Sequence, residues 1–443
     1  MSCPAANRVL GVGQFWRAQT DQFWSAPKLG NGLFESSTYN DRNQPLSMQL
    51  GVSSGSGGIW QQDYDLGTSS TNNANVRKLT LKIPGKPDVV TQYEYDALNW
   101  LKVAMEGAAV VGNGCVAGNT VWCQGFNYDV AGNVLVGSEY GVAAPLGRPS
   151  SYAAASNRVS NSGWVYDGRG NVSQIPDVAA TPDKMLFDGE DRMAQYCGNS
   201  LAACDTVVPG GNRTIYRYDV LGKRVRKEGV GGDLTFVHDA FGELAAEYGG
   251  TESWKRSYVT VDHLGSTRVV TEANGSVGER RDYLGFGGEV GSSVGSRSGV
   301  AGYGVDLASR VKCSSKERDA ESGLDYFGAR YYSGAMGRFT SADAPFADQH
   351  PGDPQRWNLY SYVRNNPLRY VDDDGHGAKE FWLGMTNAFS ANHTYGYGRL
   401  NASHPDERMG QKAGDALSVI LGGVEVAFGG GVAARGVAVC ATG

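Results

Sequence analysis

A short phrase centred on aspartate returns along this chain and limits what the chain can fold into. Its form is an aromatic residue, Asp, two variable residues and Gly, followed by a β-rich run. Clear copies begin at Tyr128, Tyr166, Tyr218 and His238, another is centred on Asp262, and worn copies begin at Tyr95 and Phe187. Successive copies lie 20 to 38 residues apart, a spacing typical of a repeat array.

Each copy predicts a β-hairpin. Asp at the start of a turn accepts a hydrogen bond from a backbone N–H two residues on. Gly supplies the positive φ of a tight turn, and the run after Gly has strand composition. Because one hairpin is only marginally stable in water, we expect neighbouring hairpins to pair into a long sheet. The repeated aspartates are therefore interpreted as turn builders, not as catalysts.

Composition agrees with an all-β protein. The 443 residues include 63 Gly, 23 Tyr and 15 Pro, which favours many short strands and turns and more than one simple core. The net charge of −6 argues against a nucleic-acid partner. The basic run at 223–227 alternates charge with an apolar residue, and we interpret it as a solvated strand face.

Two cysteine pairs indicate disulfides. Cys115 and Cys123 flank a short Gly/Asn loop, and so do Cys197 and Cys204. Local pairs that close insertions are typical of an oxidising environment, although four unrelated thiols would give the same sequence. No cleavable secretion signal is visible at the N-terminus. We expect a secreted or cell-surface protein that either uses another export route or is a fragment of a longer chain.

The chain divides into five predicted parts. Residues 1–75 form an N-terminal region that is partly irregular and partly degenerate repeat, with residues 39–46 as a degenerate copy, and residues 76–290 are the repeat array. Residues 291–312 are Gly/Ser/Val-rich and predict a flexible loop. Residues 313–377 form a denser block, called here the core block. Residues 378–443 form a truncated tail with helix-forming stretches and a Gly-rich apolar run.

Four longer phrases follow one another in the later half. They begin at Asp262 (Asp-His-Leu-Gly-Ser-Thr-Arg), at Glu317, at Gly337 (Gly-Arg-Phe-Thr-Ser-Ala-Asp) and at Asn358. Together with the repeats, this ordered set resembles the RHS (YD-repeat) family and its RHS repeat-associated core domain. The resemblance covers roughly residues 90–375.

The resemblance implies both fold and function. In that family the repeats wind an antiparallel β-strip into a hollow shell, the core domain closes it, and a variable toxin follows. We therefore expect an all-β protein: a spiralling strip that forms a partial shell, closed by a core or plug domain, with a short helical Gly-rich tail. The implied function is the C-terminal portion of a polymorphic toxin used in interbacterial competition, with its cargo missing here. The implied partners are a C-terminal toxin cargo, secretion or delivery machinery and an immunity protein.

Self-cleavage is also implied by the resemblance. Family members carry Asp-Pro-x-Gly-Leu near the end of the core and are cut after the leucine. Here Asp372 and Gly375 match, while Asp373 stands in place of the proline and His376 in place of the leucine. A proline would have fixed φ and removed a donor beside the cut. The cut is therefore expected near His376.

The candidate catalytic residues are Asp343, Asp372 and Arg338. Two carboxylates can share a proton and activate water, as in aspartyl proteases. Arg338 is expected to orient or charge-balance one carboxylate. The alternative is that both aspartates only cap turns.

Other chemistry is not favoured by the sequence. We expect no cofactor and no metal, because neither H-E-x-x-H nor G-x-S-x-G occurs and the acidic residues near 372 do not fit an EF-hand loop. Two charges, Glu425 and Arg435, interrupt the apolar run of the tail and argue against a membrane span.

Two alternative functions remain open. The chain could be a cell-surface YD-repeat protein whose exposed aromatics bind carbohydrate or a partner protein. It could also carry a toxin enzyme in its tail, with His393 and His404 as reactive groups.

Overall fold

Two compact units divide the chain in the computed structural model, and every described residue belongs to the unit of residues 7–15 and 23–378. The structure describes residues 8–9, 28–107, 115, 120–142, 148–176, 182–198, 204, 213–229, 232–238, 244–250, 257–305, 310–344 and 352–377. The predicted helical tail, including Glu425, Arg435, His393 and His404, lies outside these residues.

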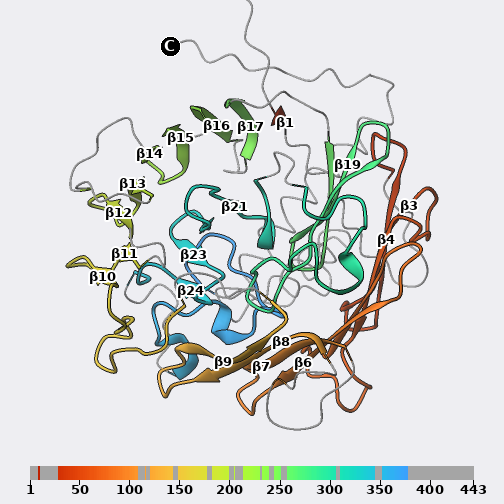
Figure 1. Cartoon of the computed structure of the whole chain (residues 1–443), viewed down its shortest axis with the longest axis horizontal. Helices are drawn as coiled ribbons and strands as arrows, with labels where there is room; N and C mark the ends of the chain where they lie inside the picture. Colours follow the sequence, from red (N-terminus) through yellow and green to blue (C-terminus); the bar gives the residue numbers. More distant parts are fainter. Residues whose placement is uncertain are drawn as a thin grey trace, which may run out of the picture. The chain divides into compact units, whose positions relative to one another are not determined.

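The first long sheet is an eight-stranded antiparallel meander. Its strands pair in chain order from β2 to β9 (Figure 1). They are β2 (Phe34–Tyr39), β3 (Pro45–Gly51), β4 (Trp60–Asp65), β5 (Lys78–Lys82), β6 (Val89–Tyr95), β7 (Leu101–Gly107), β8 (Thr120–Tyr128) and β9 (Val134–Tyr140).

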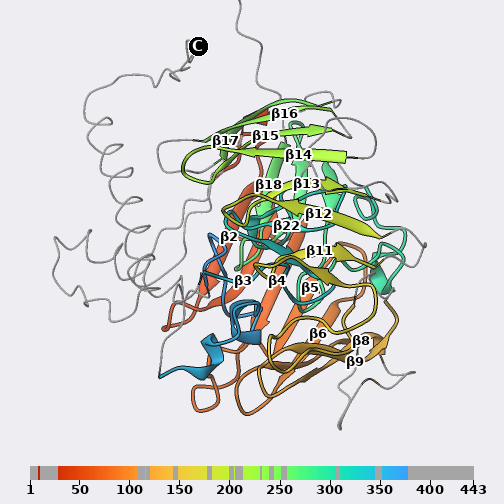
Figure 2. The same ribbon diagram turned by 90° about the vertical axis from the view of Figure 1, so that its left-hand side faces the viewer.

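The second long sheet has nine strands, and β10 to β17 again pair in chain order (Figure 2). These are β10 (Val165–Tyr166), β11 (Val172–Ile175), β12 (Asp183–Phe187), β13 (Met193–Cys197), β14 (Arg213–Tyr218), β15 (Arg224–Gly229), β16 (Leu234–His238) and β17 (Leu244–Gly249). The ninth strand, β1 (Arg8–Val9), pairs with β17.

Two smaller sheets complete the unit. One contains β18 (Ser257–Val261), β19 (Thr267–Glu272) and β20 (Val277–Arg280). The other belongs to the core block and contains β21 (Glu317–Arg318), β22 (Asp325–Tyr326), β23 (Tyr331–Ser333) and β24 (Arg338–Phe339). Four 3-10 helices are η1 (Gly295–Arg297), η2 (Cys313–Ser315), η3 (Pro354–Arg356) and η4 (Val363–Asn365). The described residues contain no α-helix.

The prediction of an all-β, antiparallel architecture is confirmed. Apart from β1, which pairs with β17, the strands of the two long sheets pair with their sequence neighbours, and the strips are not closed into barrels. The N-terminal region 1–75 contains regular strands next to the degenerate repeat expected at residues 39–46. Strands β2 to β4 continue the same sheet as the later repeats, and the turn at Asn40 has the geometry of a repeat turn: Asn40 Oδ1 accepts from N–H of Arg42 and Gln44 at 2.9 and 3.0 Å.

The repeated aspartate builds its turn as predicted. Asp129 Oδ1 accepts hydrogen bonds from N–H of Ala131 and Asn133, each at 2.9 Å. Gly132 has a φ of 76° and donates its N–H to the Asp129 carbonyl. At five other repeat turns the aspartate Oδ1 likewise accepts the backbone N–H groups two and four residues on. These aspartates are Asp96, Asp167, Asp188, Asp219 and Asp262.

The worn copies keep this geometry without glycine. Asn99 and Asp191 take the left-handed position, each with a φ of 63°. Asn and Asp tolerate that region better than other side chains, because their short polar groups bond locally. A missing glycine therefore does not end the array.

Most repeat turns are followed directly by a β-bulge, which the sequence did not indicate. Tyr218 pairs with Arg224, but its neighbour Arg217 pairs with Arg226, so Val225 is the extra residue. The bulge changes which side chains share a face. Arg224 and Lys227, three residues apart, are both buried, whereas Arg226 is exposed. The interpretation of 223–227 as a solvated face is therefore wrong for its two buried cations.

The repeat tyrosine ties consecutive repeats together. The Tyr128 hydroxyl donates to the Leu101 carbonyl at 2.5 Å, and the Tyr218 hydroxyl donates to the Met193 carbonyl at 2.8 Å. Each acceptor lies at the start of the strand that follows the preceding repeat turn. Burial raises the pKa of Tyr128 well above its ordinary value, so the hydroxyl keeps its proton.

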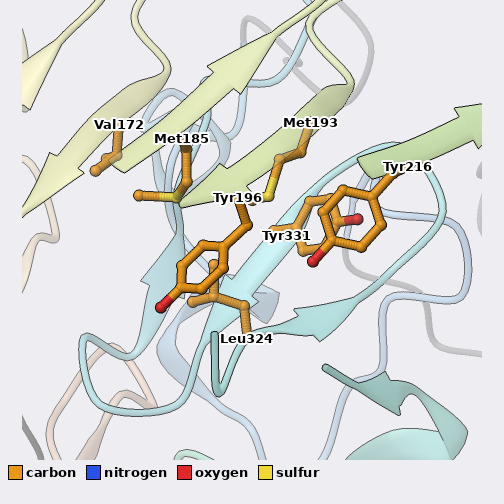
Figure 3. Close-up of a cluster of buried hydrophobic side chains, with 7 residues drawn as sticks. All are labelled: Val172, Met185, Met193, Tyr196, Tyr216, Leu324 and Tyr331. Carbon is orange, nitrogen blue, oxygen red and sulfur yellow. The ribbon is translucent and has the colours of Figure 1, made fainter. Parts of the chain in front are cut away.

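The core block packs against the nine-stranded sheet through a buried cluster. Five of its members come from the repeat array and two from the core block, and they face one another (Figure 3). They are Val172, Met185, Met193, Tyr196, Tyr216, Leu324 and Tyr331. This cluster fixes strands β22 and β23, which come before the predicted catalytic residues Asp343 and Asp372 in the sequence.

The segment expected to be a flexible loop, 291–312, contains an anchored turn. Arg297 of η1 is 2% exposed and forms ion pairs with Glu106 and Asp282 at 2.6 and 2.5 Å. Residues 306–309 lie outside the described residues. A buried cation thus anchors η1, within the segment predicted to be a loop, to two acidic residues.

Both predicted disulfides are present. Cys115 bonds Cys123 and Cys197 bonds Cys204, with sequence separations of 8 and 7. Cys313 is a free thiol in the described part of the chain. Burial raises the pKa of Cys313 to about 11.

Candidate functional site

The two predicted aspartates meet at one guanidinium group. Arg330 Nη2 lies 3.2 Å from Asp343 Oδ2 and 3.5 Å from Asp372 Oδ2. The side chains are 5%, 5% and 1% exposed, respectively, so the three charges interact with little screening by water. The core block thus brings together two acids that are distant in sequence.

Backbone pairing places Asp343. It follows β24, and its N–H donates to the Leu359 carbonyl at 2.9 Å. Phe339 of β24 donates in the same way to the Tyr360 carbonyl. The segment after β24 is therefore held against the chain that returns through residues 358–361.

Arg330 is fixed from several sides. Its guanidinium carbon lies 3.7 Å from the centre of the Phe339 ring, a close cation–π contact. Nη1 donates to the Leu359 carbonyl at 2.9 Å, and Nε donates to the Gly375 carbonyl. Arg330 therefore binds the two acids and the backbone of the segment that ends the core block.

That closing segment, residues 372–377, wraps around the Asp372 carboxylate. Oδ1 accepts N–H bonds from Asp374, Gly375 and His376 at 3.3, 2.7 and 3.2 Å. Oδ2 accepts the N–H of Gly377 at 3.1 Å. Asp372 therefore contacts the nitrogen of the peptide bond that joins His376 to Gly377.

Gly375 is required by this wrapping. Its φ is 82°, where a side chain is strained. A Cβ at Gly375 would also lie 3.0 Å from the backbone nitrogen of Arg330. The motif glycine thus allows the closing segment to approach the arginine.

His376 reaches back to the other aspartate. Its Nδ1 lies 3.2 Å from Asp343 Oδ1, and about half of its side chain is exposed. The hydrogen bond with Asp343 raises the pKa of His376 above its ordinary value of 6.5, against the opposing effect of burial. Asp343 Oδ1 also accepts the N–H of Ala344 at 2.8 Å.

Arg338 contacts residues of the repeat array instead. Its Nη1 donates to Asn133 Oδ1 at 3.0 Å and its Nη2 to the Asn157 carbonyl at 2.7 Å. Its guanidinium lies 4.7 and 4.5 Å from the ring centres of Tyr152 and Tyr360. The structure therefore assigns Arg338 to holding β24 against the repeat turns, and Arg330 takes the place predicted for it.

Sequence reasoning missed Arg330 although a signal existed. Arg330 lies in the phrase that begins at Glu317, two residues after the glycine of Asp-Tyr-Phe-Gly-Ala-Arg. Arg338 lies in the same phrase as Asp343 and is nearer to it in sequence. Strand pairing between β23 and β24 turns the nearer arginine toward Asn133.

The arrangement differs from a carboxylate pair that shares a proton. Both acids contact the same Nη2 atom, so a positive charge lies where that proton would be. No group of residues in the described part of the chain is suited to hold a metal ion. The described part also has no helix long and apolar enough to cross a membrane.

Known proteins share parts of this chain's sequence. Toxin subunit YenC2 of Yersinia entomophaga is 48% identical over 80 residues, which cover 18% of this chain and 7% of that protein. The tRNA3(Ser)-specific nuclease WapA of Bacillus spizizenii is 25% identical over 245 residues, covering 54% of this chain and 10% of that protein. Teneurin-3 of Mus musculus is 25% identical over 276 residues, covering 56% and 9%. The chain thus spans a small part of these relatives' length. No protein-family model matches the chain.

Solved structures share its fold. The crystal structure of TcdB2-TccC3 without its hypervariable C-terminal region superposes with a TM-score of 0.54 and 17% identity, over 79% of this chain and 18% of that chain. The Photorhabdus luminescens Tc holotoxin pore gives a TM-score of 0.53 and 18% identity, over 78% and 18%.

The meandering sheets, their Asp-centred turns and the core block define an all-β repeat protein built on an antiparallel strip. Sequence similarity to the YenC2 toxin subunit and to WapA agrees with that class. These similarities are consistent with an RHS, or YD-repeat, protein and support an RHS-type toxin scaffold.

Proposed function

We propose that this chain is part of a β-shell that encloses or presents a C-terminal toxin, and that its core block cuts the chain near His376. The observation that supports this most is the wrapping of the closing segment around Asp372. Four consecutive N–H groups of residues 374–377 bond that one carboxylate. Any polypeptide that follows residue 377 would therefore start from a fixed position beside two buried acids.

The proposed reaction is hydrolysis of the bond between His376 and Gly377. A water oxygen bonds to the His376 carbonyl carbon, the C–N bond breaks, and the Gly377 nitrogen gains a proton as it leaves. One product then ends in a carboxylic acid and the other begins with an amine. Asp343 is the candidate base that takes one proton from the water, and that proton is returned to the Gly377 nitrogen as it leaves. Asp372 Oδ2 is adjacent to this nitrogen at 3.1 Å.

Arg330 has a distinct part in this proposal. Its guanidinium holds the carboxylates of Asp343 and Asp372 at 3.2 and 3.5 Å. Its Nε also donates to the Gly375 carbonyl, which fixes the backbone next to the cut. Positioning of this kind contributes to catalysis by holding reacting groups in place.

The proposed partners follow from the same scaffold. They are a toxin cargo after the core block, other toxin or delivery components, and an immunity protein specific for the cargo. The proposed location is outside the producing cell, at its surface or secreted. Among the large apolar side chains that are exposed in the described part of the chain, the aromatic ones are Tyr140 and Trp357. Two such residues do not favour carbohydrate binding over the scaffold role.

The test is intact-mass analysis of purified chain incubated over time. Wild type is expected to yield a break between residues 376 and 377. Asp343→Asn and Asp372→Asn are expected to stay whole. Asp373→Asn is the matched control, because it removes a neighbouring charge of the same segment and is expected to be cut. A wild type that stays whole would contradict self-cleavage while leaving the scaffold proposal in place.

A further inference from the structure

The contact between His376 and Asp343 carries an inference that rests on the proposed cleavage. His376 is the residue on the N-terminal side of the proposed cut, and its Nδ1 lies 3.2 Å from Asp343 Oδ1. The substrate segment therefore bonds the acid that is the candidate base. Asp343 is 5% exposed, while His376 is 51% exposed, so protons of the solvent reach the imidazole directly.

We propose that His376 is a positioning residue whose protonation decides whether Asp343 bears an imidazolium contact in addition to its bonds with Arg330 and Ala344, so that cleavage is slow when the imidazole is charged and faster when it is neutral. A charged imidazole donates to Asp343 and lowers its ability to accept a proton from water. A neutral imidazole has no charge with which to hold the carboxylate. The segment that is cut thus regulates its own cutting.

The charged groups around His376 determine the direction in which its pKa is shifted. Asp343 comes from the segment after β24, Asp374 from the closing segment itself, and Arg330 from the loop before β23. The two acids favour the charged imidazole and the arginine opposes it, and the pKa of His376 is raised overall. The ion pair is therefore complete below pH 6.5, the ordinary histidine value, and is lost as pH rises through the raised pKa.

The first experiment measures the pair without cleavage. The C2 proton of His376 is followed by NMR against pH in Asp372→Asn, which is expected to stay whole, and in the double variant Asp372→Asn/Asp343→Asn. The expected result is a pKa above the ordinary value in the first protein and a lower one in the second. Equal values in the two proteins would overturn the inference, because His376 would then not sense Asp343.

The second experiment measures the cleavage rate against pH. For wild type the rate is expected to rise up to about tenfold per pH unit and then level off near the His376 titration. His376→Leu removes the imidazole, and His376→Asn keeps a polar group of similar reach without a charge. Both are expected to be cut at a rate that no longer changes over that range.

The outcomes separate this inference from the proposed function. If His376→Leu and His376→Asn keep the wild-type pH profile, the cleavage proposal stands and this inference fails. If wild type is not cut at any pH, both fail together. A flat profile in both variants beside a rising wild-type profile supports both.

Discussion

Arg224 of β15 and Asp319 of the core block form a buried ion pair, with Nη1 2.8 Å from Oδ2. The two side chains are 1% and 0% exposed. Lys227 joins them at 3.1 Å from Asp319 Oδ1 and reaches Glu321 at 2.7 Å. These contacts link the repeat sheet to the core block across about a hundred residues of sequence, and they exist because the bulge at Val225 turns both cations inward.

Removing Arg224 is expected to destabilise the protein strongly. Arg224→Met leaves Asp319 buried beside a single cation, and breaking a buried pair costs about 3–5 kcal/mol. Arg226→Met is the matched control on the same strand, because its exposed ion pairs contribute about 1 kcal/mol or less. Urea denaturation of both variants measures the difference. Similar losses in the two variants would show that burial of Arg224 has no special role.

The buried network also predicts loss of stability in acid. Burial alone would raise the pKa of Asp319, but the charges of Arg224 and Lys227 outweigh it and lower that pKa below 3.8. A carboxyl group with a lowered folded pKa stabilises the protein above its unfolded pKa, and this contribution is lost as pH falls through the folded value. The free energy of unfolding should therefore fall more steeply below pH of about 4 in wild type than in Asp319→Asn. Burial raises the pKa of Glu317, so its protonation acts in the opposite sense. The charge of Asp319 also raises the Glu317 pKa, so Asp319→Asn removes that contribution together with its own.

A repeat aspartate is expected to matter through its turn. Asp129→Ala removes the acceptor of two backbone N–H groups and of the Asn133 side-chain amide, which should cost about 1–3 kcal/mol. Val130→Ala changes the next residue of the same turn, whose side chain is fully exposed, and should change stability by less than about 0.5 kcal/mol. Thermal unfolding of the two variants compares them. The prediction is wrong if Val130→Ala destabilises as much as Asp129→Ala.

The cysteines should differ sharply toward alkylating agents. Without reductant, Cys115, Cys123, Cys197 and Cys204 should remain unmodified because they are bonded in pairs. Cys313 should react slowly, since its thiol is buried and its raised pKa, about 11, leaves little thiolate at neutral pH. Peptide mapping after alkylation reports each site. Replacing either bonded pair with serines should lower the free energy of unfolding by about 2–3 kcal/mol, because each disulfide closes a short loop.

The sequence alone determined the local architecture. The phrase aromatic-Asp-x-x-Gly was sufficient to predict hairpin turns, because the acceptor of the turn and the residue with positive φ are adjacent in the chain. The disulfides could be predicted for the same reason, since each pair closes a loop of fewer than ten residues. The residues that form each turn and each disulfide are close in sequence, so these features could be predicted without the tertiary structure.

Tertiary structure decided which charges are buried and which arginine meets the aspartates. Arg224 and Arg226 look equivalent in an alternating pattern, and only the bulge makes one of them internal. Arg330 and Arg338 both precede Asp343 in the core block. The pairing of β23 with β24 and the return of residues 358–361 place Arg330 beside the acids and Arg338 against the repeat turns. Short-range patterns define a turn, but the partner of a buried charge is set by segments that meet only when the whole chain has folded.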